Sequence, residues 1–338
     1  GILECIKNQD YDHNNMEVVL VDGASTDNTR ALMCEFALDN KDEFRRVVVL
    51  DNPKKTLPSG WNVALREYKG DAIIKVDAHA VIPEDFVSKN VRVLETGEYI
   101  CGGQRPNIID KPTPFKETLL LAESSMFGSS IASYRNNPGK TYVKSLFHAA
   151  YRREVFEKVG FFNEELVRTE DNEIHYRMRK AGYKLCFDPD IISYQYTRSS
   201  LKAMLKQKYA NGYWIGKTSK VCPKCLSIYH FVPFAFVSAI IASGSVIGAT
   251  GLAECIKKRH NHTLGKGISA LRKVTVVLTT VMWVLYALMA SGMAAVSAFK
   301  AEDKRNITNA CLPVLFLLLH LSYGIGTIAG LMDKSKRG

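Results

Sequence analysis

The chain has 338 residues and a formal net charge of +11, a length that allows about two domains of roughly 100–200 residues each. Its mean hydropathy of −0.08 conceals two unlike parts, because charges are interspersed through residues 1–225 and long apolar stretches dominate from Ser227 onward. This pattern disfavours a wholly soluble protein. A nucleic-acid-binding protein is also disfavoured, because no basic stripe interleaved with aromatic residues occurs in the polar part.

The polar part alternates between apolar, β-branched runs and segments with helix-start signals. Strands are expected over Glu17–Val21, Arg46–Leu50, Ala72–Val76 and Tyr99–Arg105, and helices over 1–11, 26–38, Asn62–Glu67, Arg153–Val159, Glu170–Gly182 and Leu201–Gly212. Such alternation predicts an α/β fold with a mostly parallel sheet that is covered by helices. Because the helix over 1–11 begins at once, we also expect that a preceding strand is missing from the sequence.

Two acidic residues follow predicted strands directly, Asp22 after the first and Asp77 after the third. Ligands of parallel sheets bind beyond the carboxyl ends of the strands, so this edge is expected to hold a cation or a polar ligand. His79 lies two positions after Asp77 and faces the same side of an extended chain. An imidazole suits Mn²⁺ better than Mg²⁺, and a purely structural role for His79 is the alternative.

A second acidic pair, Glu170 and Asp171, begins a predicted charged helix. Such a pair could serve as a general base that accepts a proton from a hydroxyl group. It could equally be a solvated helix start that is favoured by the helix dipole. Lys75 and Arg105 could contact phosphate, although surface charge explains them equally well.

Three segments of this sequence together resemble the family 2 glycosyltransferases, in the order that the family shows. They are Val18-Val-Leu-Val-Asp22-Gly-Ala-Ser-Thr-Asp27-Asn-Thr29, Ile74-Lys-Val-Asp77-Ala-His79-Ala80 and Arg168-Thr-Glu170-Asp171-Asn-Glu173. The resemblance covers about residues 1–215. The Asp77-Ala-His79 form, with a C-terminal membrane region, is similar to the succinoglycan-type, ExoA-like branch.

The resemblance implies a GT-A fold over 1–215 and an inverting transfer of a sugar from a nucleotide-diphosphate donor, such as a uridine-diphosphate sugar. It assigns Asp22, Ser25 and Asp77 to the donor, and Asp171, with Glu170 beside it, to the general base. Asp77 and His79 would bind a divalent metal, Mg²⁺ or Mn²⁺. Tyr209 and Asn211 resemble the non-processive members, which implies a lipid-linked glycan acceptor in exopolysaccharide or cell-envelope synthesis.

Residues 216–338 are expected to form a membrane region with three apolar segments, at 228–252, 274–299 and 310–332. Each is long enough for a helix that crosses about 30 Å of hydrocarbon. Scattered cysteines suggest a reducing, cytoplasmic location for the polar part, in a multi-pass protein of the cell membrane that contacts membrane lipids. Three spans would then place the six cations of 253–273 outside, against the positive-inside tendency. A first segment that is re-entrant or interfacial avoids this conflict and is slightly favoured.

Two other functions are alternatives for this sequence. A non-catalytic membrane subunit of a polysaccharide-assembly complex is supported by His79, which departs from the common Asp-x-Asp pattern. Retention of Asp22, Asp77, Glu170 and Asp171 argues against it. Other polysaccharide-assembly proteins are possible partners of the enzyme. A dinucleotide-dependent oxidoreductase is excluded, because no GxGxxG follows the first strand and the turn there is acidic.

Overall fold

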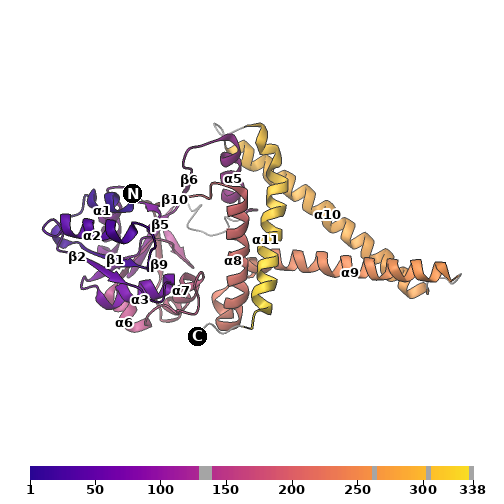
Figure 1. The fold of residues 1–338 in the computed structure, drawn as a ribbon, viewed down its shortest axis with the longest axis horizontal. Coiled ribbons are helices and arrows are strands. Elements are labelled where there is room, and N and C mark those ends of the chain that lie inside the picture. Colours follow the sequence, from indigo (N-terminus) through magenta and orange to yellow (C-terminus); the bar gives the residue numbers. More distant parts are fainter. Residues whose placement is uncertain (129–138, 261–264, 302–305, 335–338) are drawn as a thin grey trace.

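The computed structural model describes residues 1–128, 139–260, 265–301 and 306–334. An α/β part lies beside a helical part, and two helices of the helical part extend far from the rest of the molecule (Figure 1). The strands are β1 Glu17–Asp22, β2 Arg46–Asp51, β3 Ala72–Ile74, β4 Ala80–Val81, β5 Ile100–Gln104, β6 Asn107–Ile108, β7 Thr141–Val143, β8 Ala149–Arg152, β9 Leu185–Ile192 and β10 Tyr194–Tyr196. The helices are α1 Ile2–Lys7, α2 Thr29–Asp39, α3 Leu57–Glu67, α4 Phe86–Glu95, α5 Pro114–Ser124, α6 Arg153–Val159, α7 Glu170–Lys180, α8 Leu201–Val221, α9 Val232–Arg259, α10 Lys266–Lys300 and α11 Leu312–Met332.

The predicted α/β fold class is confirmed, and β1, β2 and β5 begin and end within one residue of their predicted bounds. The strand directions are more mixed than a mostly parallel sheet. In the main sheet of the described residues, of order β3-β8-β5-β9-β7, β5 and β9 are the only neighbouring strands that pair in parallel. The cause is β8, which inserts antiparallel to both β3 and β5 and leads directly into α6. Strand β8 was not among the strands expected from the sequence.

Neighbouring residues of the main sheet alternate between two apolar layers, as the pleat of a strand requires. Ile100 of β5 and Tyr151 of β8 point into one layer, which also contains Ile174 of α7. Cys101, which follows Ile100, and Ala150, which precedes Tyr151, point into the other layer with residues of α4. Helices therefore cover both faces of this sheet, and the strand ends between them are left for ligands.

Strands β1 and β3 belong to different sheets among the described residues, and a cleft of about 1580 Å³ lies between them. Val19 and Val21 of β1 and Ile73 of β3 line this cleft, and Gly23, Asp77 and His79 line it as well. A strand preceding Gly1, which we expected from the sequence, stays a prediction.

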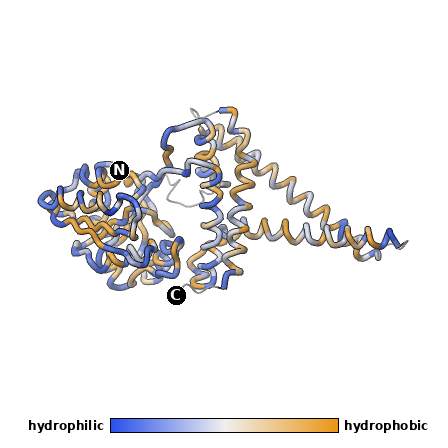
Figure 2. The backbone as a smooth tube through the Cα atoms, in the orientation of Figure 1, coloured by the Kyte–Doolittle hydropathy of each residue, from blue (hydrophilic) through white to orange (hydrophobic). Residues whose placement is uncertain are grey.

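The helical part consists of two unlike pairs (Figure 1). Helices α8 and α11 pack side by side, and α8 runs through residue 215, where the sequence places a domain boundary that stays a prediction. Helices α9 and α10 extend away from them as a hairpin with an apolar surface and a hydrophilic tip (Figure 2). The helices Ile228–Arg259, Lys266–Lys300 and Ile307–Met332 are long and apolar enough to cross a membrane.

Helix α9 runs without a break over 28 residues, and the re-entrant or interfacial placement of the first apolar segment stays a prediction. The cations of 253–273 also lie mostly on the ends of α9 and α10 and not in a long loop. Four residues of that range, 261–264, fall outside the described residues.

Candidate active site

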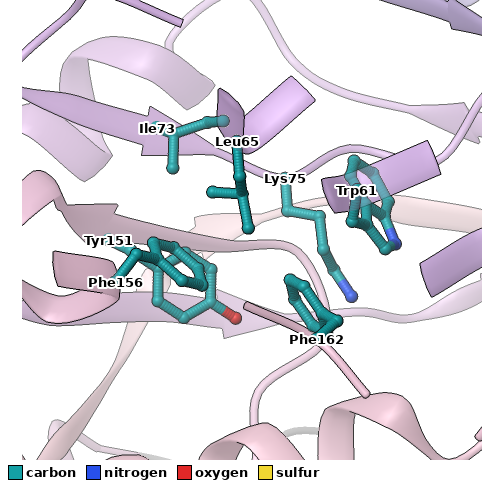
Figure 3. A pocket seen from close by; sticks show the side chains of 7 residues that line it. All are labelled: Trp61, Leu65, Ile73, Lys75, Tyr151, Phe156 and Phe162. Carbon is teal, nitrogen blue, oxygen red and sulfur yellow. The ribbon is translucent and has the colours of Figure 1, made fainter. Parts of the chain in front are cut away.

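A buried ion pair joins the end of β3 to the start of α7. The ammonium of Lys75 contacts the carboxylate of Asp171 across 96 positions of sequence. Lys75 is only 5% exposed, and its ammonium lies over the rings of Trp61, at 5.1 Å, and Phe162, at 5.7 Å (Figure 3). Aromatic faces attract a cation when water is excluded, so this lysine is fixed in position, and the surface-charge interpretation of Lys75 is wrong.

Glu170, which precedes Asp171, is buried, and its Oε2 atom has no hydrogen-bond partner within the described part of the chain. Burial raises the pKa of Glu170 to about 8, and the adjacent negative charge of Asp171 adds to the rise. Burial also raises the pKa of Asp171, while the Lys75 ammonium opposes this effect. Both carboxyl groups therefore have raised pKa values, and the cationic partner of Asp171 favours the proton on Glu170.

Asp77 is an ionised carboxylate whose charge interacts with that of Lys75. Burial acts to raise its pKa, but a hydrogen bond with His148 and the charge of Lys75 outweigh burial and lower the pKa to about 2. The Nε2 atom of His148 lies 3.3 Å from the backbone nitrogen of Asp77 and 3.8 Å from its Oδ2. On its other side, His148 Nδ1 contacts the Ser193 hydroxyl at 2.8 Å, which fixes the imidazole ring.

His79 is held at the cleft by Gln195 of β10, with 2.7 Å between His79 Nε2 and Gln195 Nε2. A histidine binds a metal through an unprotonated nitrogen while its other nitrogen carries the proton. For His79 to bind a metal through Nδ1, its Nε2–H must donate to the amide oxygen of Gln195. The amide would then be rotated by half a turn from its orientation here.

Asp22 and Ser25 form a separate polar group at the end of β1. Hydrogen bonds from Ser25 are the main cause of the lowered pKa of Asp22, and one of them is the Ser25 backbone N–H at 3.1 Å from Asp22 Oδ1. Arg30 of α2 adds a positive charge 3.7 Å from Asp22 Oδ2. The cleft links the two groups, because Gly23 and Asp77 both line it.

The residues that the sequence predicts thus fall into two sets. Asp77, Glu170 and Asp171 surround Lys75, whereas Asp22 and Ser25 lie at the other strand end. The sequence analysis missed two partners of the first set. Lys75 was not expected to pair with Asp171, and His148 was not expected to contact Asp77. Arg105 is also buried, with its guanidinium 4.2 Å from the centre of the Phe147 ring, so its surface-charge interpretation is wrong too.

A divalent metal fits this site only with help from a bound donor. In the ranges that the structure describes, no group of three or more His, Cys, Asp and Glu side chains could hold a metal. Asp77 supplies an ionised oxygen and His79 supplies one ring nitrogen. Mg²⁺ and related cations bound to nucleotides take few protein ligands and complete their shell with phosphate oxygens and water. The residues present fit a cation of that kind.

The α/β part has the GT-A fold. A solved mannosyltransferase from Pyrobaculum calidifontis, PcManGT in complex with GDP-Man and Mn²⁺, aligns with 98% of this chain and 83% of its own, with a TM-score of 0.56 and 17% identity. Residues 1–160 match the family model of glycosyl transferase family 2. Over these residues the chain is therefore similar to the family 2 glycosyltransferases.

Relatives of known name are similar over larger parts of the chain. The succinoglycan biosynthesis protein ExoA of Rhizobium meliloti (strain 1021) is 30% identical over 203 residues, which are 59% of this chain and 59% of ExoA. A dolichyl N-acetyl-alpha-D-glucosaminyl phosphate 3-beta-D-2,3-diacetamido-2,3-dideoxy-beta-D-glucuronosyltransferase of Methanococcus voltae is 26% identical over 251 residues, or 71% of this chain and 76% of that protein. Both names refer to glycan synthesis.

Proposed function

We propose that this protein is an inverting glycosyltransferase that moves a sugar from a nucleotide-diphosphate donor to a lipid-linked saccharide. The observation that carries the proposal is the contact of Asp171 with Lys75, whose charge also interacts with Glu170 and Asp77, at the end of a stretch that matches the family 2 model over residues 1–160. Further support comes from the two relatives named above, one in succinoglycan biosynthesis and one that acts on a dolichyl-linked sugar phosphate. A uridine-diphosphate sugar is the donor to test first.

Asp171 is the proposed general base. The acceptor hydroxyl attacks the anomeric carbon from the face opposite the diphosphate, the bond to the diphosphate oxygen breaks, and Asp171 takes the hydroxyl proton. Lys75 keeps the carboxylate ionised and in one orientation before the acceptor arrives. Glu170, protonated at neutral pH, leaves Asp171 as the single anionic carboxylate of the pair.

Asp77 and His79 are the proposed ligands of a divalent cation, with Asp22 and Ser25 as contacts of the donor nucleotide. A bound cation would neutralise charge on the departing diphosphate. His148 helps to hold Asp77 in place, because its Nε2 accepts a hydrogen bond from the Asp77 backbone N–H. The catalytic domain would lie in the cytoplasm of a cell whose envelope receives the product.

Purified full-length protein with a nucleotide sugar, Mn²⁺ or Mg²⁺ and a lipid-linked acceptor tests this function. Transfer should occur and should fall by about 10²–10⁴-fold in Asp171→Asn, because that is the usual contribution of a general base. Asp188→Asn, at an aspartate of β9, serves as a control of equal chemistry. Nucleotide binding by the wild type without transfer to any acceptor would instead indicate a non-catalytic subunit.

A further inference from the structure

Helix α11 is tied at both of its ends to elements on the side of the α/β part. At its start, Thr118 of α5 hydrogen-bonds to Thr308, at 2.6 Å, and to Asn309, at 2.7 Å. At its end, the carboxylate of Asp333 accepts a hydrogen bond from the Tyr213 hydroxyl, and its backbone oxygen accepts one from Lys220, at 2.9 Å. A helix with both ends on one side of a membrane does not cross it.

Helix α8, to which the end of α11 is bound, is itself fixed to the α/β part. It begins a few residues after β10, which pairs with β4 and β6. Near its other end, the Thr218 hydroxyl contacts that of Thr169, the residue directly before α7. Midway, Arg168 donates to Asn211 at 3.2 Å. The whole of α8 therefore lies along the α/β part.

Helices α8 and α11 run parallel and approach closely through glycines of both helices. A Cβ atom on Gly212 would lie 2.0 Å from the Tyr323 carbonyl oxygen, and one on Gly326 would lie 2.1 Å from that of Tyr209. Glycines spaced four apart allow such backbone contact between helices. Because α8 also carries five lysines, a membrane-crossing α11 would draw them into hydrocarbon, at about 2.5–3.5 kcal/mol for each lysine at the centre.

Helices α9 and α10 are far less buried than α11. Only 6% of the apolar window of each is buried, against 39% for α11. They are about 42 Å and about 52 Å long at 1.5 Å per residue, enough to cross a bilayer with some tilt. Their apolar surface ends in a hydrophilic tip (Figure 2), and α9 leaves the α8–α11 pair at a steep angle (Figure 1).

We propose that the α9–α10 hairpin alone crosses the membrane, and that the α8–α11 pair lies along the bilayer surface on the side of the α/β part. The partner of this surface is the lipid bilayer, whose phosphates would meet the exposed lysines of α8, Lys202 and Lys206. The cations of 253–273, at the tip of the hairpin, then lie on the side of the membrane opposite the α/β part, against the positive-inside tendency. Arg272 at this tip is paired with Glu254, which offsets one of them.

Single-cysteine reporters in the full chain test the proposal without any assay of transfer. The three reporters are Cys34 on α2, Cys255 near the tip and Lys334→Cys after α11, and both native cysteines are exposed. Each variant, free of other cysteines, is reconstituted into vesicles of mixed phosphatidylglycerol and phosphatidylethanolamine. A membrane-impermeant maleimide is then added before or after detergent.

Lys334→Cys should react before detergent in the same fraction of molecules as Cys34, and Cys255 in the complementary fraction. If Lys334→Cys follows Cys255, α11 crosses the bilayer and the proposal is overturned. If all three react in the same fraction, the hairpin does not cross and the proposal is equally overturned. Trypsin digestion of wild-type vesicles provides the same comparison without substitutions, with peptides cut at Lys334 measured against those cut at Lys257 and Lys258.

Discussion

The ammonium of Lys75 and the carboxylate of Asp171 form an ion pair between the end of β3 and the first turn of α7. Lys75 is almost completely buried, whereas the Asp171 side chain keeps 20% of its surface exposed. The carboxylate is thus open to an acceptor on one side and fixed on the other. This asymmetry suits a base that must stay ionised and must also accept a proton.

Lys75→Met should lower the turnover number by about 10²-fold, within the range of lost general-base catalysis, and leave donor affinity nearly unchanged. The reason is that Asp171, without its cation in a buried site, has a higher pKa and binds a proton at neutral pH. The acidic limb of the pH–rate profile should therefore move to higher pH. Turnover across pH and donor binding by calorimetry measure these effects.

The matched control is Lys54→Met, which removes the same charge from a 70% exposed lysine paired with Glu164. Exposed ion pairs contribute about 0–1 kcal/mol, so this variant should behave like the wild type. Equal losses of turnover in both variants would show that the effect of Lys75 is one of general charge and not of its contact with Asp171.

Glu170→Gln should make the protein more stable above neutral pH. The folded-state pKa of Glu170 is about 8, raised from its ordinary value of 4.5, so between these values Glu170 of the folded chain holds a proton that it has lost in the unfolded chain. The contribution of Glu170 to the stability of the wild type therefore falls as pH rises from about 4.5 to 8. Glutamine removes this loss, and each kcal/mol regained should raise the melting temperature by about 2–4 °C.

Melting temperatures in detergent at pH 5.5 and pH 8.5 measure this difference between wild type and variant. The gap between the two proteins should be larger at pH 8.5. A gap that is constant with pH would mean that Glu170 is ionised in the folded protein. Glu165→Gln, at an exposed glutamate before α7, is the control and should show no such trend.

The sequence predicted those parts of the site that follow from local pattern. Asp77 was expected at a sheet edge because an apolar run ends there, and Asp171 because a charged helix begins beside it. Lys75 gave no such signal, since it interrupts an apolar run and its burial depends on a residue 96 positions away. His148 was missed for the same reason, because its partners Asp77 and Ser193 meet it only in the folded sheet.

The membrane region shows the same limit. Apolar length identified all three long helices, because length and composition are local properties. The pairing of α8 with α11 depends on glycines about 114 positions apart, such as Gly212 and Gly326. The length of an apolar segment could not distinguish a lipid-facing helix from one packed against a polar partner.

His79→Asn should weaken activation by Mn²⁺ more than activation by Mg²⁺, because an imidazole favours the transition metal. Asp77→Asn should weaken both, since hard cations require its carboxylate oxygen. Titration of transfer activity with each metal, at saturating donor, gives the two activation constants. An exposed histidine at the end of α9 supplies the control variant His260→Asn, which should leave both unchanged. Unaltered Mn²⁺ activation in His79→Asn would limit this histidine to its contact with Gln195.

Gly326→Ala should destabilise the helical part, because the added Cβ atom would lie 2.1 Å from the Tyr209 carbonyl oxygen and would force α8 away from α11. Overpacking of this kind typically costs about 1–3 kcal/mol. Gly292→Ala in α10 is the matched control, since nothing lies within 4 Å of its Cβ position. Thermal unfolding in detergent, followed by tryptophan fluorescence, to which Trp214 on α8 contributes, should show a lower transition for Gly326→Ala alone. Because α8 also contacts Thr169 directly before α7, transfer activity should fall in the same variant, and equal transitions in the two variants would contradict the close α8–α11 contact.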